Sequence, residues 1–182
     1  MKSDFKQSIK DAYLKSFFLR TKNEIEDSDD QANSVLTKIY TDILYDNGTI
    51  SDYELLYFEK EITKNSNIKI NGYSFSEEDL RLDLFITHYD PSEKIQEIKY
   101  NSVLELIENA KNFYLQSAKK LYEKINKKED AYDISKIIYK NVNEITTVRI
   151  FVLTNCKCEK TPPMHRVGRI EFQNYLLDLG RI

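Results

Sequence analysis

The chain of 182 residues contains only four glycines and three prolines, and it has no tryptophan. Because glycine and proline punctuate helices and strands, their scarcity predicts long regular elements and few tight turns. The hydrophobic fraction of 41% and the charged fraction of 31% are those of a globular chain rather than a disordered one. The simplest organisation is a single domain over 1–182, with a helical part at 1–46 and a sheet-and-helix core at 50–182.

A basic excess is also missing, since 27 Lys and Arg stand against 30 Asp and Glu and the net charge is −3. Proteins that bind DNA unaided gain affinity largely by neutralising phosphates. Nucleic-acid binding by this chain would therefore depend on a local basic face.

Long apolar segments are absent as well. The first residues, MKSDFKQSIKDAY, contain no apolar signal-peptide core. No run approaches the roughly 20 apolar residues that span a bilayer. We therefore expect a cytoplasmic protein that makes no membrane contact.

Two helices are expected first. Apolar side chains recur at helical spacing over 3–20 and again over 33–45, and the polar, acidic stretch 23–33 breaks the pattern between them. Asp46-Asn47-Gly48 ends the second helix, and Gly48 suits a left-handed cap.

Three strands are expected next, at 53–62, 68–75 and 81–89, with turn residues at 65–67 and 76–79. The second and third alternate apolar and polar side chains, and the connections are short. This pattern predicts an antiparallel meander.

The second half predicts helices at about 101–127 and 130–143, followed by a strand at 148–154. This last strand is apolar on both faces, as a central parallel strand reached by a helical crossover would be. Residues 161–168 are expected to form a loop, and 169–172 and 175–179 short edge elements. We therefore expect an α/β (α+β) fold with a mixed sheet flanked by helices. The element order is that of the restriction-endonuclease-like, PD-(D/E)XK fold, although an unrelated α+β sandwich has the same order.

Several segments together resemble the N-terminal domain of AIPR proteins, the abortive-infection phage-resistance family. The matching segments are GTISDYELLYFEKE (48–61), INGYSFSEEDLRLDLFITHYD (70–90), AYDISKIIYKN (131–141), VRIFVLTN (148–155) and LLDLGRI (176–182). The resemblance implies a PD-(D/E)XK-like fold and a role in bacterial anti-phage defence. It also implies a larger C-terminal region in full-length members, so that this chain is expected to be an isolated domain, a truncated chain or a short relative.

Nuclease chemistry on this fold needs an acid on one strand and an acid-x-Lys pair on the next, which together hold a divalent metal such as Mg²⁺ and activate water. One register places Asn71 at the first position and Asp83-Leu84-Phe85 at the second, which is a degraded site. Because side chains alternate along a strand, Asp83 and Phe85 share a face. If Phe85 is in the core, Asp83 needs a Lys or Arg partner there.

A second register uses Asp83 as the first acid and Glu97-Ile98-Lys99 as the acid-x-Lys, with Asp83 and Glu97 as metal ligands. It requires 94–100 to be a strand. The cysteines offer a weaker alternative, in which Cys156, Cys158 and His165 would bind zinc. His88 is expected at a strand end near solvent.

Three functional hypotheses remain open. The first is a catalytically degenerate nuclease-like domain that acts in recognition or assembly and binds nucleic acid or a protein partner. The second is an active, metal-dependent nuclease that uses Asp83, Glu97 and Lys99. The third is a protein-interaction or dimerisation domain without nucleic acid. The acidic composition favours the first and third.

Overall fold

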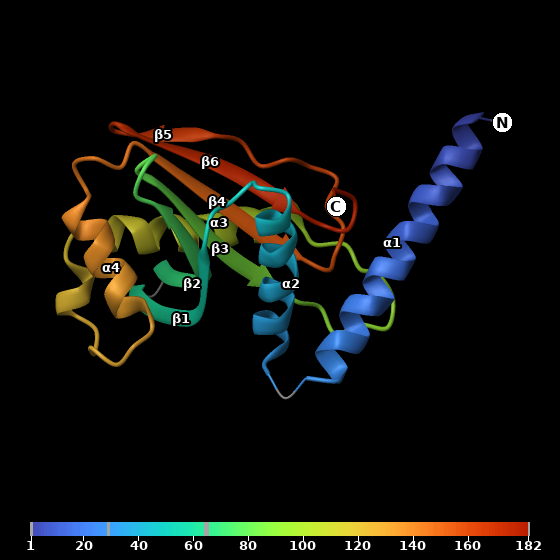
Figure 1. The fold of residues 1–182 in the computed structure, drawn as a ribbon, viewed down its shortest axis with the longest axis horizontal. Helices are drawn as coiled ribbons and strands as arrows, with labels where there is room; N and C mark the ends of the chain where they lie inside the picture. The colour runs from blue at the N-terminus through green and yellow to red at the C-terminus, as the bar shows by residue number, and fades with distance from the viewer. Residues whose placement is uncertain (1, 29, 64–65, 182) are drawn as a thin grey trace.

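The computed structural model describes residues 2–28, 30–63 and 66–181 (Figure 1). A six-stranded mixed sheet has the strand order β1-β2-β3-β4-β6-β5. The strands are β1 (Tyr53–Thr63), β2 (Ser66–Ser76), β3 (Arg81–His88), β4 (Thr147–Thr154), β5 (His165–Val167) and β6 (Ile170–Leu177). The helices are α1 (Lys2–Glu26), α2 (Ala32–Asp46), α3 (Tyr100–Ser117) and α4 (Ala131–Lys140), with a short 3₁₀ helix, η1 (Leu121–Glu123). The expected mixed α+β fold is confirmed.

The first three strands form the expected antiparallel meander, because β1 pairs with β2 and β2 pairs with β3. Strand β4 lies between β3 and β6 and is parallel to both. The prediction that 148–154 is internal is therefore confirmed. The strand is apolar on both faces because helices pack against both sides of the sheet. Helix α3 belongs to the crossover from β3 to β4.

The sheet is the middle of three layers (Figure 1). Leu84 of β3 and Ile150 of β4 face α3 and α4 in the larger core cluster. Phe85 and Phe151 are the next residues along the same strands, and they face α1 and α2 in the second cluster. Their rings lie 5.7 Å apart. Alternation along two adjacent parallel strands thus supplies both cores.

Helix α1 is longer than the sequence suggested, because it continues to Glu26 instead of ending near residue 20. Thr21 and Ile25 are buried one turn apart, while Glu24 and Glu26 are exposed. Glu24 and Glu26 thus lie on the solvent face of α1, although the sequence predicts that the acidic stretch 23–33 interrupts the helical pattern. None of the described helices is long and apolar enough to cross a membrane.

The prediction of two short edge elements near the end of the chain is wrong. Residues 170–177 form one strand, β6, which is internal because β5 covers its far side. Strand β5 itself lies in the stretch expected to be a loop. The polar Asn174 occupies a buried position of β6, where its Nδ2 donates to the Pro163 carbonyl at 2.5 Å. A polar residue at a core-facing position concealed the alternation.

The helix expected over 101–127 also ends earlier, at Ser117. Lys120 has a φ of +64°, which is left-handed and ends the α-helical path, and η1 follows. Leu121 and Ile125 are both buried beyond this break. Their spacing of four residues imitates a continuing helix in the sequence.

Candidate functional site

The Asp83 carboxylate is held between strands by arginine. Arg149 Nε donates to Asp83 Oδ1 at 2.6 Å, and Arg149 Nη2 donates to Oδ2 at 2.5 Å. Nη2 also donates to the Thr49 carbonyl at 2.9 Å, and Arg81 Nε lies 3.7 Å from Oδ1. The Asp83 side chain is only 2% exposed. Burial raises the pKa of Asp83, and the two guanidinium groups oppose that shift. Both carboxylate oxygens are occupied.

The residues of the first nuclease register, Asn71, Asp83 and Phe85, are all buried and form no open site. Phe85 is fully buried under α2, on the same side of the sheet as Asp83, so the expected cationic partner is Arg149. Asn71 is buried too, but its Oδ1 accepts from the Thr87 backbone N–H at 2.9 Å. Thr87 is four residues beyond Asp83, or about 13 Å along a strand. The amide and the carboxylate therefore do not meet.

The second register is not assembled either. Residues 94–100 contain a single β-bridge, Glu97 with Lys157, and α3 begins at Tyr100. Glu97 and Lys99 are both exposed. Lys157 follows the carboxyl end of β4, eight residues after Arg149, which pairs with Asp83. The structure thus separates Glu97 from Asp83 by more than about 16 Å along the strands.

The carboxyl edge of the parallel strands instead gathers a different group of side chains. His88 ends β3, Asp90 follows two residues later, and Cys156 follows β4. Their ligand atoms, one from each residue, lie within 4.8 Å of one another. Among the described residues, they form a group of potential metal ligands. Cys156 is a buried free thiol, and His88 and Asp90 are half-buried.

The surroundings shift the pKa values of these three groups in different directions. Burial lowers the pKa of His88, so the neutral imidazole is favoured. Burial raises the pKa of Cys156, and the Asp90 and Asp178 carboxylates raise it further. Hydrogen bonds from Ser92 lower the pKa of Asp90.

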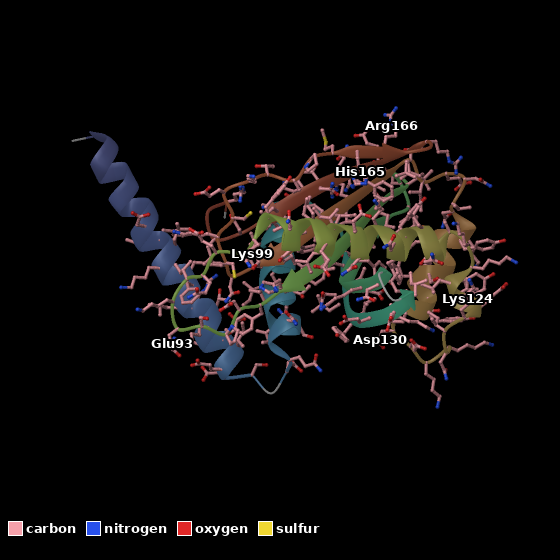
Figure 2. All side chains as sticks on the ribbon, turned by 180° about the vertical axis from the view of Figure 1, so that it is seen from behind. Glu93, Lys99, Lys124, Asp130, His165 and Arg166 are labelled. Atoms are coloured by element: carbon pink, nitrogen blue, oxygen red, sulfur yellow. The ribbon has the colours of Figure 1, made fainter. Side chains whose placement is uncertain are left out.

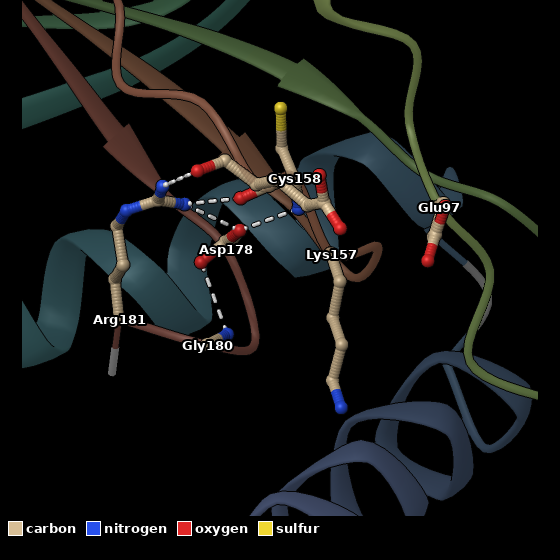
Figure 3. A pocket seen from close by; sticks show the side chains of 7 residues that line it. Glu97, Lys157, Cys158, Asp178, Gly180 and Arg181 are labelled. Atoms are coloured by element: carbon tan, nitrogen blue, oxygen red, sulfur yellow. Dashed lines mark hydrogen bonds and ion pairs between the residues drawn. The ribbon is translucent and has the colours of Figure 1, made fainter.

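An open hollow of about 360 Å³ lies along the same edge (Figure 3). Asp178 forms its floor and accepts from the Cys158 backbone N–H at 2.7 Å and from Arg181 Nη1 at 2.6 Å. Arg181 also donates to the Cys158 carbonyl at 2.9 Å. Because Asp178, Arg181 and the Cys158 backbone meet one another's hydrogen-bonding needs, they stabilise the turn at 178–181. Glu97 and Lys157 also line the hollow.

A basic and aromatic surface lies at the other end of the molecule, around η1 and α4; Figure 2 places Lys124 there, far from Glu93. We give the name lysine–tyrosine face to the exposed lysines and half-buried tyrosines of residues 119–139, which are Lys119, Lys120, Lys124, Lys127, Lys128, Lys136, Tyr122, Tyr132 and Tyr139. Its lysines are exposed, and its tyrosine rings pack in a row with centroids 5.5 and 6.2 Å apart.

Two lysines of this face lie over tyrosine rings. Lys120 Nζ lies 5.5 Å from the Tyr139 ring, and Lys136 Nζ lies 5.9 Å from the Tyr132 ring. Within the described residues Lys120 is paired with Glu123, whereas Lys124, Lys127 and Lys128 have no carboxylate within ion-pair distance. Exposed ammonium groups can bind phosphates, and tyrosine rings can stack with bases.

Neither surface was identified from the sequence. HYD at 88–90 and NCKC at 155–158 each follow a strand, and the parallel pairing expected for those strands would have placed both ends at one edge. The zinc set suggested earlier is not formed, because His165 pairs with Phe172, level with the start of β4, whereas Cys158 follows its end. The lysines of the lysine–tyrosine face were overlooked because the net charge of the whole chain is −3.

Comparison with known proteins gives one finding. The family model described as "Abortive infection phage resistance protein N-terminal domain" matches residues 36–182. No curated protein and no solved structure matches significantly. The matched range begins inside α2 and takes in the whole sheet, the Asp83–Arg149 pair and the carboxyl edge.

Proposed function

Because the chain belongs to the abortive infection phage resistance family as its N-terminal domain, we propose that it recognises nucleic acid without cleaving it. The observation that carries this proposal is the condition of Asp83. Both its oxygens are bound by Arg149, and in the first register the buried Phe85 stands where the acid-x-Lys pair needs its lysine. A carboxylate closed in this way has no lone pair directed at a metal ion, so little remains to activate water.

The lysine–tyrosine face supplies the recognition surface in this proposal. Lys119 to Lys128 contains five lysines and one glutamate, in a chain whose net charge is −3. Glu129 and Asp130 follow directly, so the positive field is local. We therefore expect modest affinity that falls steeply with salt, and a preference for unpaired strands, whose bases can stack on tyrosine rings.

Fluorescence anisotropy with labelled single-stranded and duplex oligonucleotides, in EDTA and at several salt concentrations, tests this binding. The double variant K127A/K128A should weaken binding and flatten the dependence of log Kd on log salt by about one to two units. The matched control is K94A/K99A, which removes two exposed lysines outside the lysine–tyrosine face; Figure 2 places Lys99 beside the start of α3, away from Lys124. Equal losses in both doubles, or no binding by the unmodified protein, would refute the proposal.

A plasmid-nicking assay with Mg²⁺ and Mn²⁺ tests the absence of cleavage. We expect none beyond background. Metal-dependent cleavage that disappears in both D83A and K99A, with unchanged circular dichroism, would instead establish the active nuclease that uses Asp83, Glu97 and Lys99.

A second candidate function is assembly with a protein partner, either a further region of a longer chain or another molecule. It is favoured by α1, which extends well beyond the sheet (Figure 1) and exposes Tyr13 by 55% and Leu19 by 46%. Light scattering coupled to size exclusion tests it. A self-associating chain would become monomeric in L19E, and a monomer in both proteins would remove dimerisation through this helix.

A further inference from the structure

The carboxyl edge of β3 and β4 holds a histidine, an aspartate and a cysteine around a common point. One ligand atom from each of His88, Asp90 and Cys156 lies within 4.8 Å of the other two. These residues come from two chain segments that are 66 positions apart, so local sequence does not account for their meeting. We propose that His88, Asp90 and Cys156 bind one zinc ion.

The backbone around the three side chains is fixed before any ion arrives. His88 pairs with Thr154 in the parallel register of β3 and β4. The Asn155 carboxamide then clamps the next turn: its Oδ1 accepts from the Asp90 N–H at 2.8 Å, and its Nδ2 donates to the Asp90 carbonyl at 2.7 Å. Asp90 Oδ1 accepts from the Ser92 N–H at 2.9 Å. Such outer hydrogen bonds orient metal ligands.

The ligand chemistry selects the metal. One imidazole nitrogen, one carboxylate oxygen and one thiolate sulfur suit zinc, whereas magnesium and calcium prefer all-oxygen sets. Zinc–ligand bonds of about 2.0–2.3 Å in a tetrahedron place ligand atoms about 3.3–3.8 Å apart. Each pair here needs to close by at most about 1.5 Å, which side-chain rotation can supply. Binding forms a Zn–S bond and releases the Cys156 thiol proton to solvent.

Access to the site is one-sided. Cys156 is 1% exposed and closes the inner side, while His88 and Asp90 are half-buried and open to solvent. An ion can therefore enter, and a water molecule can complete the fourth position. The Lys69 ammonium is close enough to lower the pKa of His88, so it would repel a bound zinc ion. Lys69 is itself paired with Glu59 at 3.5 Å, which offsets part of this repulsion. Asp178 adds a further negative charge near Cys156.

Cobalt substitution of the metal-free protein is the direct test, because Co²⁺ reports both its geometry and a thiolate ligand by absorption. We expect one Co²⁺ per chain, visible bands of a four-coordinate ion and a near-ultraviolet sulfur-to-cobalt band. Zinc should displace the cobalt and erase the spectrum. Titration against a chromophoric chelator gives the zinc affinity, in the absence of nucleic acid.

Matched variants separate this site from incidental binding. C156S should abolish the sulfur-to-cobalt band, and H88Q should weaken zinc by more than the roughly 10–100-fold expected for losing an outer partner. N155A, which removes the clamp, should fall within that 10–100-fold range. The controls are C158S and H165Q, the other cysteine and the other histidine, which should bind as the unmodified protein does.

Three results would overturn the proposal: no stoichiometric binding, a sulfur-to-cobalt band that survives in C156S, or a loss in C158S or H165Q equal to that in C156S or H88Q. Far-ultraviolet circular dichroism of each metal-free variant establishes folding. H88Q alters a half-exposed side chain and keeps the test decisive if the buried C156S variant does not fold.

Discussion

The guanidinium group of Arg149 holds both carboxylate oxygens of Asp83 across the parallel strands β4 and β3. The two side chains are 12% and 2% exposed, so the pair is largely withdrawn from water. Removing one partner from such a pair leaves an uncompensated charge, which is more costly than removing both.

We therefore expect R149A to lower the free energy of unfolding by about 3–5 kcal/mol. Urea unfolding followed by circular dichroism measures it. The double variant D83L/R149M should lose less than R149A alone, and R81A, whose Nε is 3.7 Å from Asp83, should lose little. A double variant that is less stable than R149A would contradict this account of the pair.

Tyr40 joins α2 to the end of β4, because its buried hydroxyl donates to the Thr154 carbonyl at 2.7 Å. Y40F removes the donor and keeps the ring, so it should destabilise the protein by about 1–3 kcal/mol. Y13F changes an exposed tyrosine and should have no measurable effect. Equal thermal midpoints for Y40F and the unmodified protein would show that the bond contributes nothing net.

Gly72 and Gly48 should respond differently to substitution. A Cβ at Gly72 would lie 2.7 Å from the Glu54 carbonyl oxygen, so G72A should cost about 1–3 kcal/mol and G72N more. Gly48 has a φ of +72° and open space around it, so G48A should cost about 1 kcal/mol and G48N less. Chemical denaturation of the four variants tests the two opposite rankings of alanine and asparagine.

His165 should make stability depend on pH. Burial lowers its pKa from 6.5, Lys111 lowers it further, and Glu108 acts in the other direction. The unfolded chain therefore takes up a proton that the folded one resists, so stability is present above pH 6.5 and is lost as pH falls below it. Between pH 7.5 and 5.5, in EDTA, H165Q should show a smaller decline than the unmodified protein. His88, whose pKa burial also lowers, accounts for a remaining slope.

The sequence predicted the elements whose periodicity matches their burial. Ile150 and Phe151 face opposite cores, and this double burial is visible as an unbroken apolar run. Prediction failed where a polar residue is buried, as at Asn174, or where apolar spacing continues past a break, as at Lys120. In each case a tertiary contact or a backbone turn overrides the local pattern.

The candidate sites were harder to predict for a physical reason. The need of Asp83 for a cationic partner followed from alternation, but the partner, Arg149, could be identified only with the strand register. Glu97 and Lys99 have the right linear spacing, yet the segment that carries them crosses the wrong end of the sheet. His88 and Cys156 have no linear spacing to recognise, since only the parallel pairing unites them.

That pairing also has a consequence for the time course of folding. The meander can form between neighbours in sequence, whereas β3 and β4 cannot pair until the chain over 89–146 has closed on itself. Closure of so long a loop costs entropy before any contact is gained, and nonlocal strand pairing is correspondingly slow. We expect the Asp83–Arg149 pair and the His88–Cys156 edge to be absent until this late step, because both require the same register.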